Sequence, residues 1–196
     1  MRYFTATTVR VSAFVVGIQN FQEITHEKSL VDCEEPTLEF VRVMAALGDR
    51  LGPLLIQLPP SFAVQGMDVL ETFLSKLPHG PRYAVEVRHR SWLGSDLAAM
   101  LREHEAALVL VDYPRMPRME EATAGFSYIR WLGDRQEFPS GHTEARRDRS
   151  EDLRWWSSLV GRFLGEGRTV FAYANNHYQN HSPTTLARFL EIRGSR

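Results

Sequence analysis

The sequence predicts an α/β protein with a TIM-barrel-like parallel sheet and outer helices. Strand-like and helix-like segments alternate along the chain, and the strand-like ones are apolar enough to be covered on both faces. Polar side chains recur within or at the C-terminal ends of successive predicted strands, where a TIM barrel builds its site. An open doubly wound sheet places its site mainly at one switch point. The barrel is preferred, since the chain has no glycine-rich dinucleotide motif and no P-loop.

The first half of the pattern contains two helices and two strands. Pro36 suits a first helical turn, and the apolar residues after it recur at three- and four-residue steps. The apolar run after Gly52 is bounded by prolines, which is typical of a strand covered on both faces. The predicted elements are a helix over 35–51, a strand over 53–60, a helix over 67–77 and a strand in 83–92.

The second half continues the alternation. A serine suits the start of two of its helices, at Ser95 and at Ser182, where Pro183 follows. The segment 134–149 is polar and charged without an apolar period, so it is predicted to be a loop. The remaining predictions are a helix over 95–105, strands over 108–112 and 126–133, a helix over 150–164, a strand over 169–176 and a helix from 182.

Composition limits the class of protein. The chain has 196 residues, 43% hydrophobic and 24% charged, which suits one soluble domain over residues 1–196. A formal net charge of -1 gives no global electrostatic attraction to nucleic acid or to an anionic membrane. Nucleic acid is therefore a disfavoured partner, a membrane is excluded as one, and the oligomeric state stays open.

The compartment is predicted to be the cytoplasm. Cys33 is the only cysteine, so the chain can form no internal disulfide. The longest apolar runs are strand-sized and too short to cross a bilayer. Residues 1–16 lack the continuous apolar core and small-residue cleavage site of a signal peptide.

The strand in 83–92 carries the strongest functional signal. Side chains alternate along a strand, so Glu86 and Arg88 share the face opposite Val85 and Val87. A buried ion pair is costly unless something uses it. Glu86 is predicted to be a catalytic acid or base and Arg88 to bind an anionic group, with a structural ion pair as the alternative.

Asp112, at the end of the next strand, is predicted to be a second catalytic carboxylate. Its alternative role is to cap the following turn. The other predicted substrate-binding residues, besides Arg88, are Gln57, His89, Trp92, Arg130, Asn175 and Asn176. Each of four residues also has a structural alternative to substrate binding. Trp92 could pack against the rim instead of stacking on substrate, and Arg130 could balance nearby negative charge. Asn175 and Asn176 could form a turn.

The sequence does not identify a cofactor. A divalent metal is possible but is not favoured. His26, His89, His177 and His181 could supply nitrogen ligands to a divalent metal, and the predicted carboxylates could supply oxygen. The chain has no HExxH motif, however, and scattered histidines are usually surface or hydrogen-bonded residues.

Several long motifs occur along the chain in the same order as in a known protein family. They are Glu23-Ile24-Thr25-His26, the stretch from Leu51 to Phe62, the stretch from Tyr83 to Trp92, Asp112, the stretch from Tyr128 to Gly133, and Tyr173-Ala174-Asn175-Asn176. The sequence resembles the YecE-like family, known as domain of unknown function 72, from about residue 14 to the C-terminus. The resemblance implies a TIM barrel with a polar rim and no established activity.

The N-terminus departs from that family. Members that resemble this chain begin with two further strand–helix units, and this chain enters at the family's third strand, around residues 14–19. Residues 1–13 are then an atypical start, and 14–196 a partial barrel with six candidate strands instead of eight.

Three functions follow as hypotheses. The first is a hydrolase-type enzyme acting on an anionic, phosphorylated small-molecule or polymeric substrate at the C-terminal rim, since no redox or group-transfer cofactor motif is present. The second is a non-catalytic protein that binds an anion or nucleic acid through the same arginines. The third is an inactive shortened form.

Overall fold

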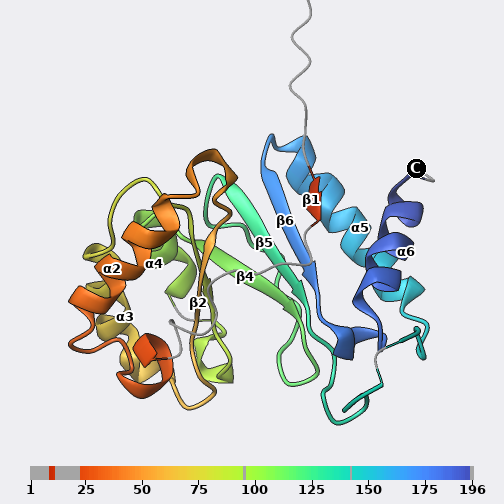
Figure 1. Cartoon of the computed structure of the whole chain (residues 1–196), viewed down its shortest axis with the longest axis horizontal. Helices are drawn as coiled ribbons and strands as arrows, with labels where there is room; N and C mark the ends of the chain where they lie inside the picture. Colours follow the sequence, from red (N-terminus) through yellow and green to blue (C-terminus); the bar gives the residue numbers. More distant parts are fainter. Residues whose placement is uncertain (1–8, 12–22, 95, 142, 195–196) are drawn as a thin grey trace, which may run out of the picture. The chain divides into compact units, whose positions relative to one another are not determined.

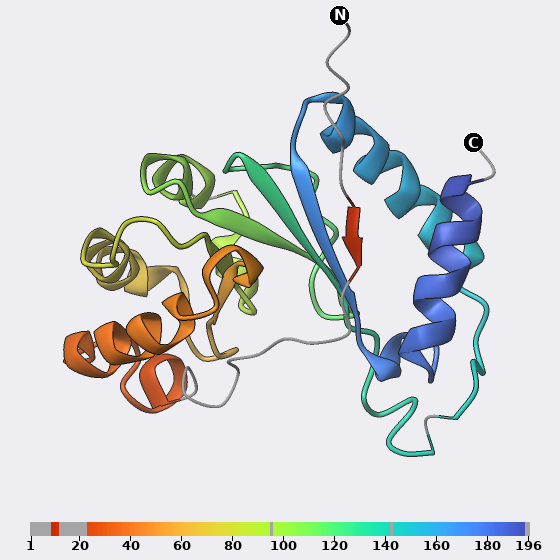
Figure 2. The same ribbon diagram turned by 45° about the horizontal axis from the view of Figure 1, so that its top comes forward.

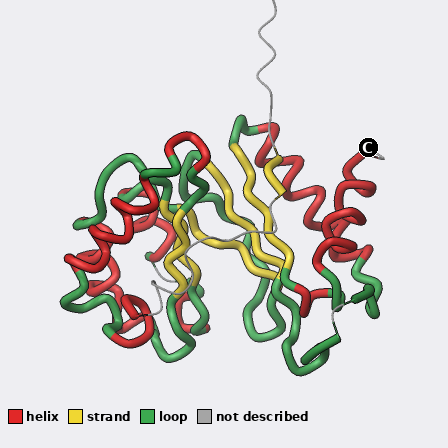
Figure 3. Tube along the Cα trace, viewed as in Figure 1, coloured by secondary structure: helices red, strands yellow, loops and turns green. Residues whose placement is uncertain are grey.

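The chain forms two compact units. The computed structural model describes residues 9–11, 23–94, 96–141 and 143–194. The N-terminal unit is Val15–Val109, and the C-terminal unit is Leu110–Arg196 together with Met1–Phe14. Strand β4 (Ala107–Asp112) begins in the first unit and ends in the second. In both units the tube trace shows strands, in yellow, accompanied by helices, in red (Figure 3).

The N-terminal unit has a parallel sheet. Strand β2 (Leu54–Gln57) pairs with β3 (Tyr83–Glu86), and β3 pairs with the start of β4. Helices α2, α3 and α4 lie one after another beside these strands (Figures 1 and 2). Their bounds are Glu34–Ala45, Met67–Ser75 and Leu97–Glu103. One-turn helices cover Glu23–Glu27, Gly48–Arg50, Val64–Gly66 and Arg90–Trp92.

The core of this unit lies between the strands and helices. Apolar side chains on β2 and β3 meet those on one side of each helix, and burying them removes about 25 cal/mol of unfavourable hydration per Å². The fully buried apolar residues include Ile56, Leu58, Leu70, Ala84, Val85 and Leu101.

The C-terminal unit has its own parallel set of strands. Strand β6 (Thr169–Ala174) pairs with β1 (Val9–Val11) on one side and with β5 (Phe126–Trp131) on the other. Helices α5 (Ser150–Gly165) and α6 (Ser182–Gly194) lie side by side next to β6 (Figures 1 and 2). A one-turn helix covers Asn176–Tyr178. The aromatic core is Trp131 from β5, Trp156 from α5, Tyr178 and Phe189 from α6.

From α2 onward the predicted order of helices and strands is confirmed, with several ends corrected. Strand β1 was not predicted, since it lies in residues 1–13, which were predicted to be an atypical start. The helix predicted over 35–51 ends at Ala45, because the chain turns at Gly48 with a positive φ of 53°. The strand predicted in 83–92 ends at Glu86, and a one-turn helix follows at Arg90–Trp92. The predicted loop 134–149 contains no helix or strand among its described residues.

Two predictions fall on residues outside the described ranges: the strand around 14–19 and the helix start at Ser95. Among the helices of the described ranges, none is both long and apolar enough to cross a membrane.

Candidate functional site

The predicted pairing of Glu86 with Arg88 is present. Glu86 is the last residue of β3, and its side chain is 0% exposed. Arg88 follows two residues later with a side chain that is 14% exposed, and its Nε donates to Glu86 Oε1. A charge-assisted bond of this kind offsets part of the cost of burying the carboxylate. The pair therefore places a held guanidinium at the carboxyl end of a parallel strand.

Gln57 ends the neighbouring strand at the same level. The register of the β2–β3 pair sets Gln57 opposite Glu86, and the next backbone N–H, of Leu58, donates to the Glu86 carbonyl at 2.9 Å. Gln57 is half-buried, whereas Leu58 is fully buried. The structure thus brings the side chains of Gln57, Glu86 and Arg88 to one edge of the N-terminal unit's sheet.

His89 shapes the loop that follows. Its Nδ1 accepts the Ser91 backbone N–H at 3.1 Å and lies 2.7 Å from the Ser91 hydroxyl oxygen. Because Nδ1 accepts the backbone N–H, the ring proton of a neutral His89 belongs on Nε2. The Ser91 hydroxyl in turn accepts the Val64 backbone N–H at 2.9 Å, which ties the loop after β3 to the loop after β2. His89 itself is exposed and can present Nε2–H to a ligand.

Trp92 packs under the loop after β2. It is 2% exposed, and its indole N–H donates to the Phe62 carbonyl at 2.9 Å. Its ring is parallel to that of Phe62, with ring centroids 6.2 Å apart and planes 3° apart. This geometry supports the packing alternative for Trp92, and its direct contact with substrate stays a prediction.

Asp112, in the C-terminal unit, is the centre of a buried polar cluster. Its Oδ2 accepts from Arg118 Nη2 at 2.7 Å, from Trp156 Nε1 at 2.7 Å and from the Tyr178 hydroxyl at 2.9 Å. Burial, together with the charge of Asp112, raises the pKa of the Tyr178 phenol above its usual value, so Tyr178 stays a donor. Three donors on one oxygen support a structural role, and catalysis by Asp112 stays a prediction.

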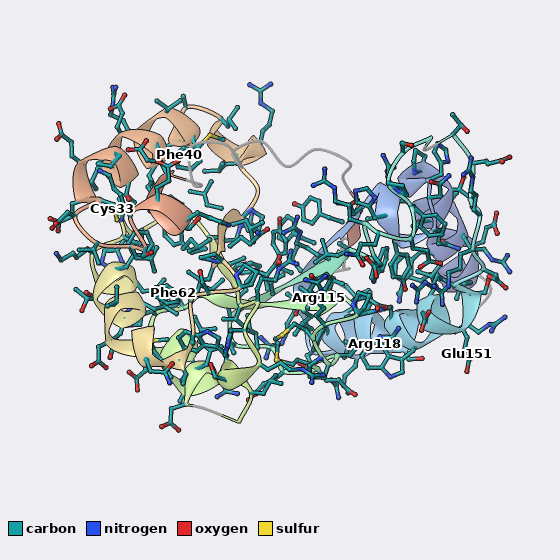
Figure 4. All side chains as sticks on the ribbon, turned by 90° about the horizontal axis from the view of Figure 1, so that it is seen from below. Cys33, Phe40, Phe62, Arg115, Arg118 and Glu151 are labelled. Carbon is teal, nitrogen blue, oxygen red and sulfur yellow. The ribbon has the colours of Figure 1, made fainter. Side chains whose placement is uncertain are left out.

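Arg118 was not predicted, although it joins two carboxylates. Besides Asp112 it donates to Asp152, in the first turn of α5, and its guanidinium lies 5.2 Å from the ring centroid of Trp155. Figure 4 shows Arg118 alongside α5. Arg149 donates to the same Asp152 at 3.3 Å. Arg118 therefore fastens the loop between β4 and β5 to α5, and we call this contact the Arg118 strap.

The Arg118 strap is expected to weaken in acid. Burial by itself would raise the pKa of Asp152, but the hydrogen bonds and charges of Arg118 and Arg149 outweigh it and hold that pKa below the usual aspartate value. A lowered folded-state pKa stabilises the fold above the unfolded-state pKa of about 4, and this stabilisation is lost as pH falls through the folded value. We expect Asp152→Asn to flatten the decline of melting temperature below about pH 4. Melting curves of the unaltered chain and of Asp152→Asn between about pH 7 and pH 2.5 measure this decline. Equal declines in melting temperature for the two proteins would contradict the prediction.

The asparagine pair after β6 builds turns. Asn175 Oδ1 accepts the His177 backbone N–H at 3.0 Å, and Asn176 Oδ1 accepts the backbone N–H of Ser182, the first residue of α6, at 2.9 Å. Both side-chain oxygens are thus engaged locally, which supports turn formation, the alternative to substrate binding. Binding through the amide nitrogens stays a prediction.

Arg130 lies in β5, opposite Tyr173 of β6 in the register, and is 9% exposed. The structure thus places Gln57, Glu86, Arg88, His89 and Trp92 in the N-terminal unit, and Asp112, Arg130, Asn175 and Asn176 in the C-terminal unit. That the two sets form one rim stays a prediction.

The described residues offer no ligand set for a metal. Across those ranges, no group of three or more His, Cys, Asp and Glu side chains is placed to hold an ion. His177 Nδ1 instead lies 2.6 Å from the Phe138 carbonyl oxygen, and His181 Nδ1 lies 2.7 Å from the Thr184 hydroxyl. Cys33 is buried as a free thiol, and burial raises its pKa.

Comparison with known families agrees with this architecture. A model of the family described as protein of unknown function DUF72 matches residues 4–196. The chain belongs to the DUF72 family. The resemblance to YecE-like proteins is thereby confirmed, and the family description assigns no activity.

Individual relatives match parts of the DUF72 chain. The UPF0759 protein YecE of Escherichia coli strain K12 is 38% identical over 66 residues, and YecE of E. coli O157:H7 gives the same figures. The match covers 34% of this chain and spans about a quarter, 24%, of the curated relative.

Solved DUF72 structures share the fold. A DUF72 family protein from Thermotoga maritima MSB8 is similar with a TM-score of 0.71 and 23% identity, covering 89% of this chain and 70% of its own. One from Enterococcus faecalis V583 gives a TM-score of 0.70 and 18% identity, with coverages of 86% and 72%. The predicted TIM-barrel-like α/β class is confirmed.

Proposed function

We propose that this DUF72 chain is a hydrolase-type enzyme that cleaves a phosphorylated substrate at the carboxyl ends of β2 and β3. The observation that carries the proposal is the Glu86–Arg88 pair, a buried carboxylate bonded to a guanidinium just beyond a parallel strand. Parallel sheets of the TIM-barrel type build their sites at these ends.

Each residue of the pair has a distinct role in this proposal. Arg88 binds the phosphate through its guanidinium, which Glu86 holds by Nε. Glu86 takes a proton from water as the water oxygen bonds to phosphorus and the phosphorus–oxygen bond to the leaving group breaks. The leaving group takes this proton from Glu86 as it departs, which returns the carboxylate to its charged form. Gln57, level with Glu86, orients the substrate.

Glu86→Gln is the test. The glutamine oxygen can still accept the Arg88 Nε bond, so the fold is expected to survive, whereas general-base catalysis is lost and turnover falls about 100-fold or more. Phosphate release from a panel of phosphomonoesters and phosphodiesters measures it, with and without added Mg²⁺ or Mn²⁺. Far-ultraviolet circular dichroism and melting curves control for folding. Unchanged turnover in Glu86→Gln would refute the assignment of Glu86.

A second candidate function is anion binding without catalysis. The observation in its favour is the complete burial of Glu86, which suits a residue that only positions Arg88. In that case no phosphate ester is cleaved, inorganic phosphate still binds Glu86→Gln, and Arg88→Ala abolishes binding. Strong salt dependence of binding would accompany it.

A further inference from the structure

The loop after β2 carries an aromatic ring that stacks on Trp92, in the loop that follows Arg88. Phe62 comes five residues after the end of β2 at Gln57, and Trp92 comes four residues after Arg88. The two rings are parallel within 3°, with centroids 6.2 Å apart, which is an offset stack. Of the pair, Trp92 is buried and Phe62 is half-buried, so Phe62 is the ring that a ligand can reach.

The Phe62 ring is held in place from several sides. The Trp92 indole N–H donates to the carbonyl of Phe62 itself, and the Ser91 hydroxyl accepts the Val64 N–H two residues further on. Gly66 packs so closely on the ring that a Cβ there would lie 2.6 Å from Phe62 Cζ. A ring fixed in this way loses little further freedom when another ring stacks on it.

The loops that carry Phe62 and Arg88 also belong to one edge of the sheet. Leu58 and Glu86 join them by a backbone bond, and the Val64–Ser91 and Trp92–Phe62 bonds join them again further out. Two hydrogen-bonded loops therefore carry an aromatic ring and a guanidinium, a combination of groups that suits a ligand with both a flat ring and a phosphate.

We propose that Phe62 is a specificity-determining residue that stacks on the ring of the substrate, so that the substrate is a phosphate ester carrying a flat aromatic or heteroaromatic group, of the nucleotide class. This inference rests on the proposed function, because Arg88 supplies the phosphate contact. Stacking of a base on an aromatic side chain contributes about 1–3 kcal/mol, or about 5- to 150-fold in affinity.

Calorimetric titration of the full chain tests the inference with three probes: adenosine 5′-monophosphate, ribose 5-phosphate and inorganic phosphate. We expect the nucleotide to bind about tenfold more tightly than ribose 5-phosphate. Phe62→Leu should remove most of that difference while leaving ribose 5-phosphate binding unchanged, and Phe62→Tyr, which keeps the ring, should retain it. The comparison of ligands on the unaltered chain needs no variant, so it stands even if Phe62→Leu does not fold.

The outcomes separate the two proposals. Equal affinity for the nucleotide and ribose 5-phosphate, with no effect of Phe62→Leu, would overturn the stacking role and leave the phosphate site in place. Tight nucleotide binding that Arg88→Ala does not weaken would overturn the link to Arg88. Failure of all three probes to bind, together with no phosphate release from any ester, would overturn the proposed function and the stacking role with it.

Discussion

Gly133→Ala is expected to destabilise the C-terminal unit by about 4 kcal/mol or more. Gly133 has a φ of +66°, and a Cβ there would lie 2.1 Å from the His177 carbonyl oxygen and 2.5 Å from Tyr178 Cα. Both contacts are with backbone, so no side-chain rotation can relieve them. The substitution must therefore separate the end of β5 from the one-turn helix at Asn176–Tyr178, and urea unfolding measures the loss.

Gly165→Ala is the matched control for that measurement. Gly165 is the last residue of α5 in the same unit, and a Cβ there meets nothing within 4 Å. Alanine at a compatible position stabilises by about 0.4–1 kcal/mol through the unfolded chain. Equal unfolding free energies for the two variants would show that Gly133 and His177 do not approach each other as described.

Asp112→Ala is the second change with a large expected effect. It removes the acceptor shared by Arg118, Trp156 and Tyr178, and leaves buried donors and a partly buried cation without their common partner. Removing one partner of a buried charged network costs about 3–5 kcal/mol. Urea unfolding at neutral pH measures the free energy, and increased hydrogen exchange in the β4–β5 loop would locate the change at the Arg118 strap.

Asp112→Asn is the control for this prediction. The amide keeps an oxygen that can accept from Trp156 or Tyr178 but loses the charge that Arg118 pairs with. We therefore expect a smaller loss than for alanine. A loss below about 1 kcal/mol for Asp112→Ala would contradict the structural role of Asp112.

Much of the fold was predictable because its signals are local. Apolar runs bounded by prolines indicated β2, and the spacing of apolar side chains indicated α3 and α5. Alternation along the predicted strand indicated the pairing of Glu86 with Arg88, and the pair is present although β3 ends at Glu86 and Arg88 lies in the loop after it. The ends of elements were less predictable, because they depend on single turns such as the one at Gly48.

The candidate site was only partly predictable because its contacts join distant segments. Nothing near Arg118 in the sequence indicates that it reaches Asp152, 34 residues later. Tryptophan is a residue type that often binds ligands, so the sequence indicated Trp92. Only the fold shows that the Phe62 ring stacks on Trp92, and that Trp92 is buried whereas Phe62 is half-buried. The side-chain oxygens of Asn175 and Asn176 proved to be turn acceptors, a choice that the sequence left open.

The sequence by itself determined the α/β class, the order of elements from α2 onward and the charged end of β3, because side-chain periodicity and alternation follow from backbone geometry alone. Only the tertiary structure decided which polar groups form structural hydrogen bonds and ion pairs. That decision depends on packing between segments far apart in the chain, which placed three donors on Asp112 and left the Phe62 ring half-buried in the loop after β2.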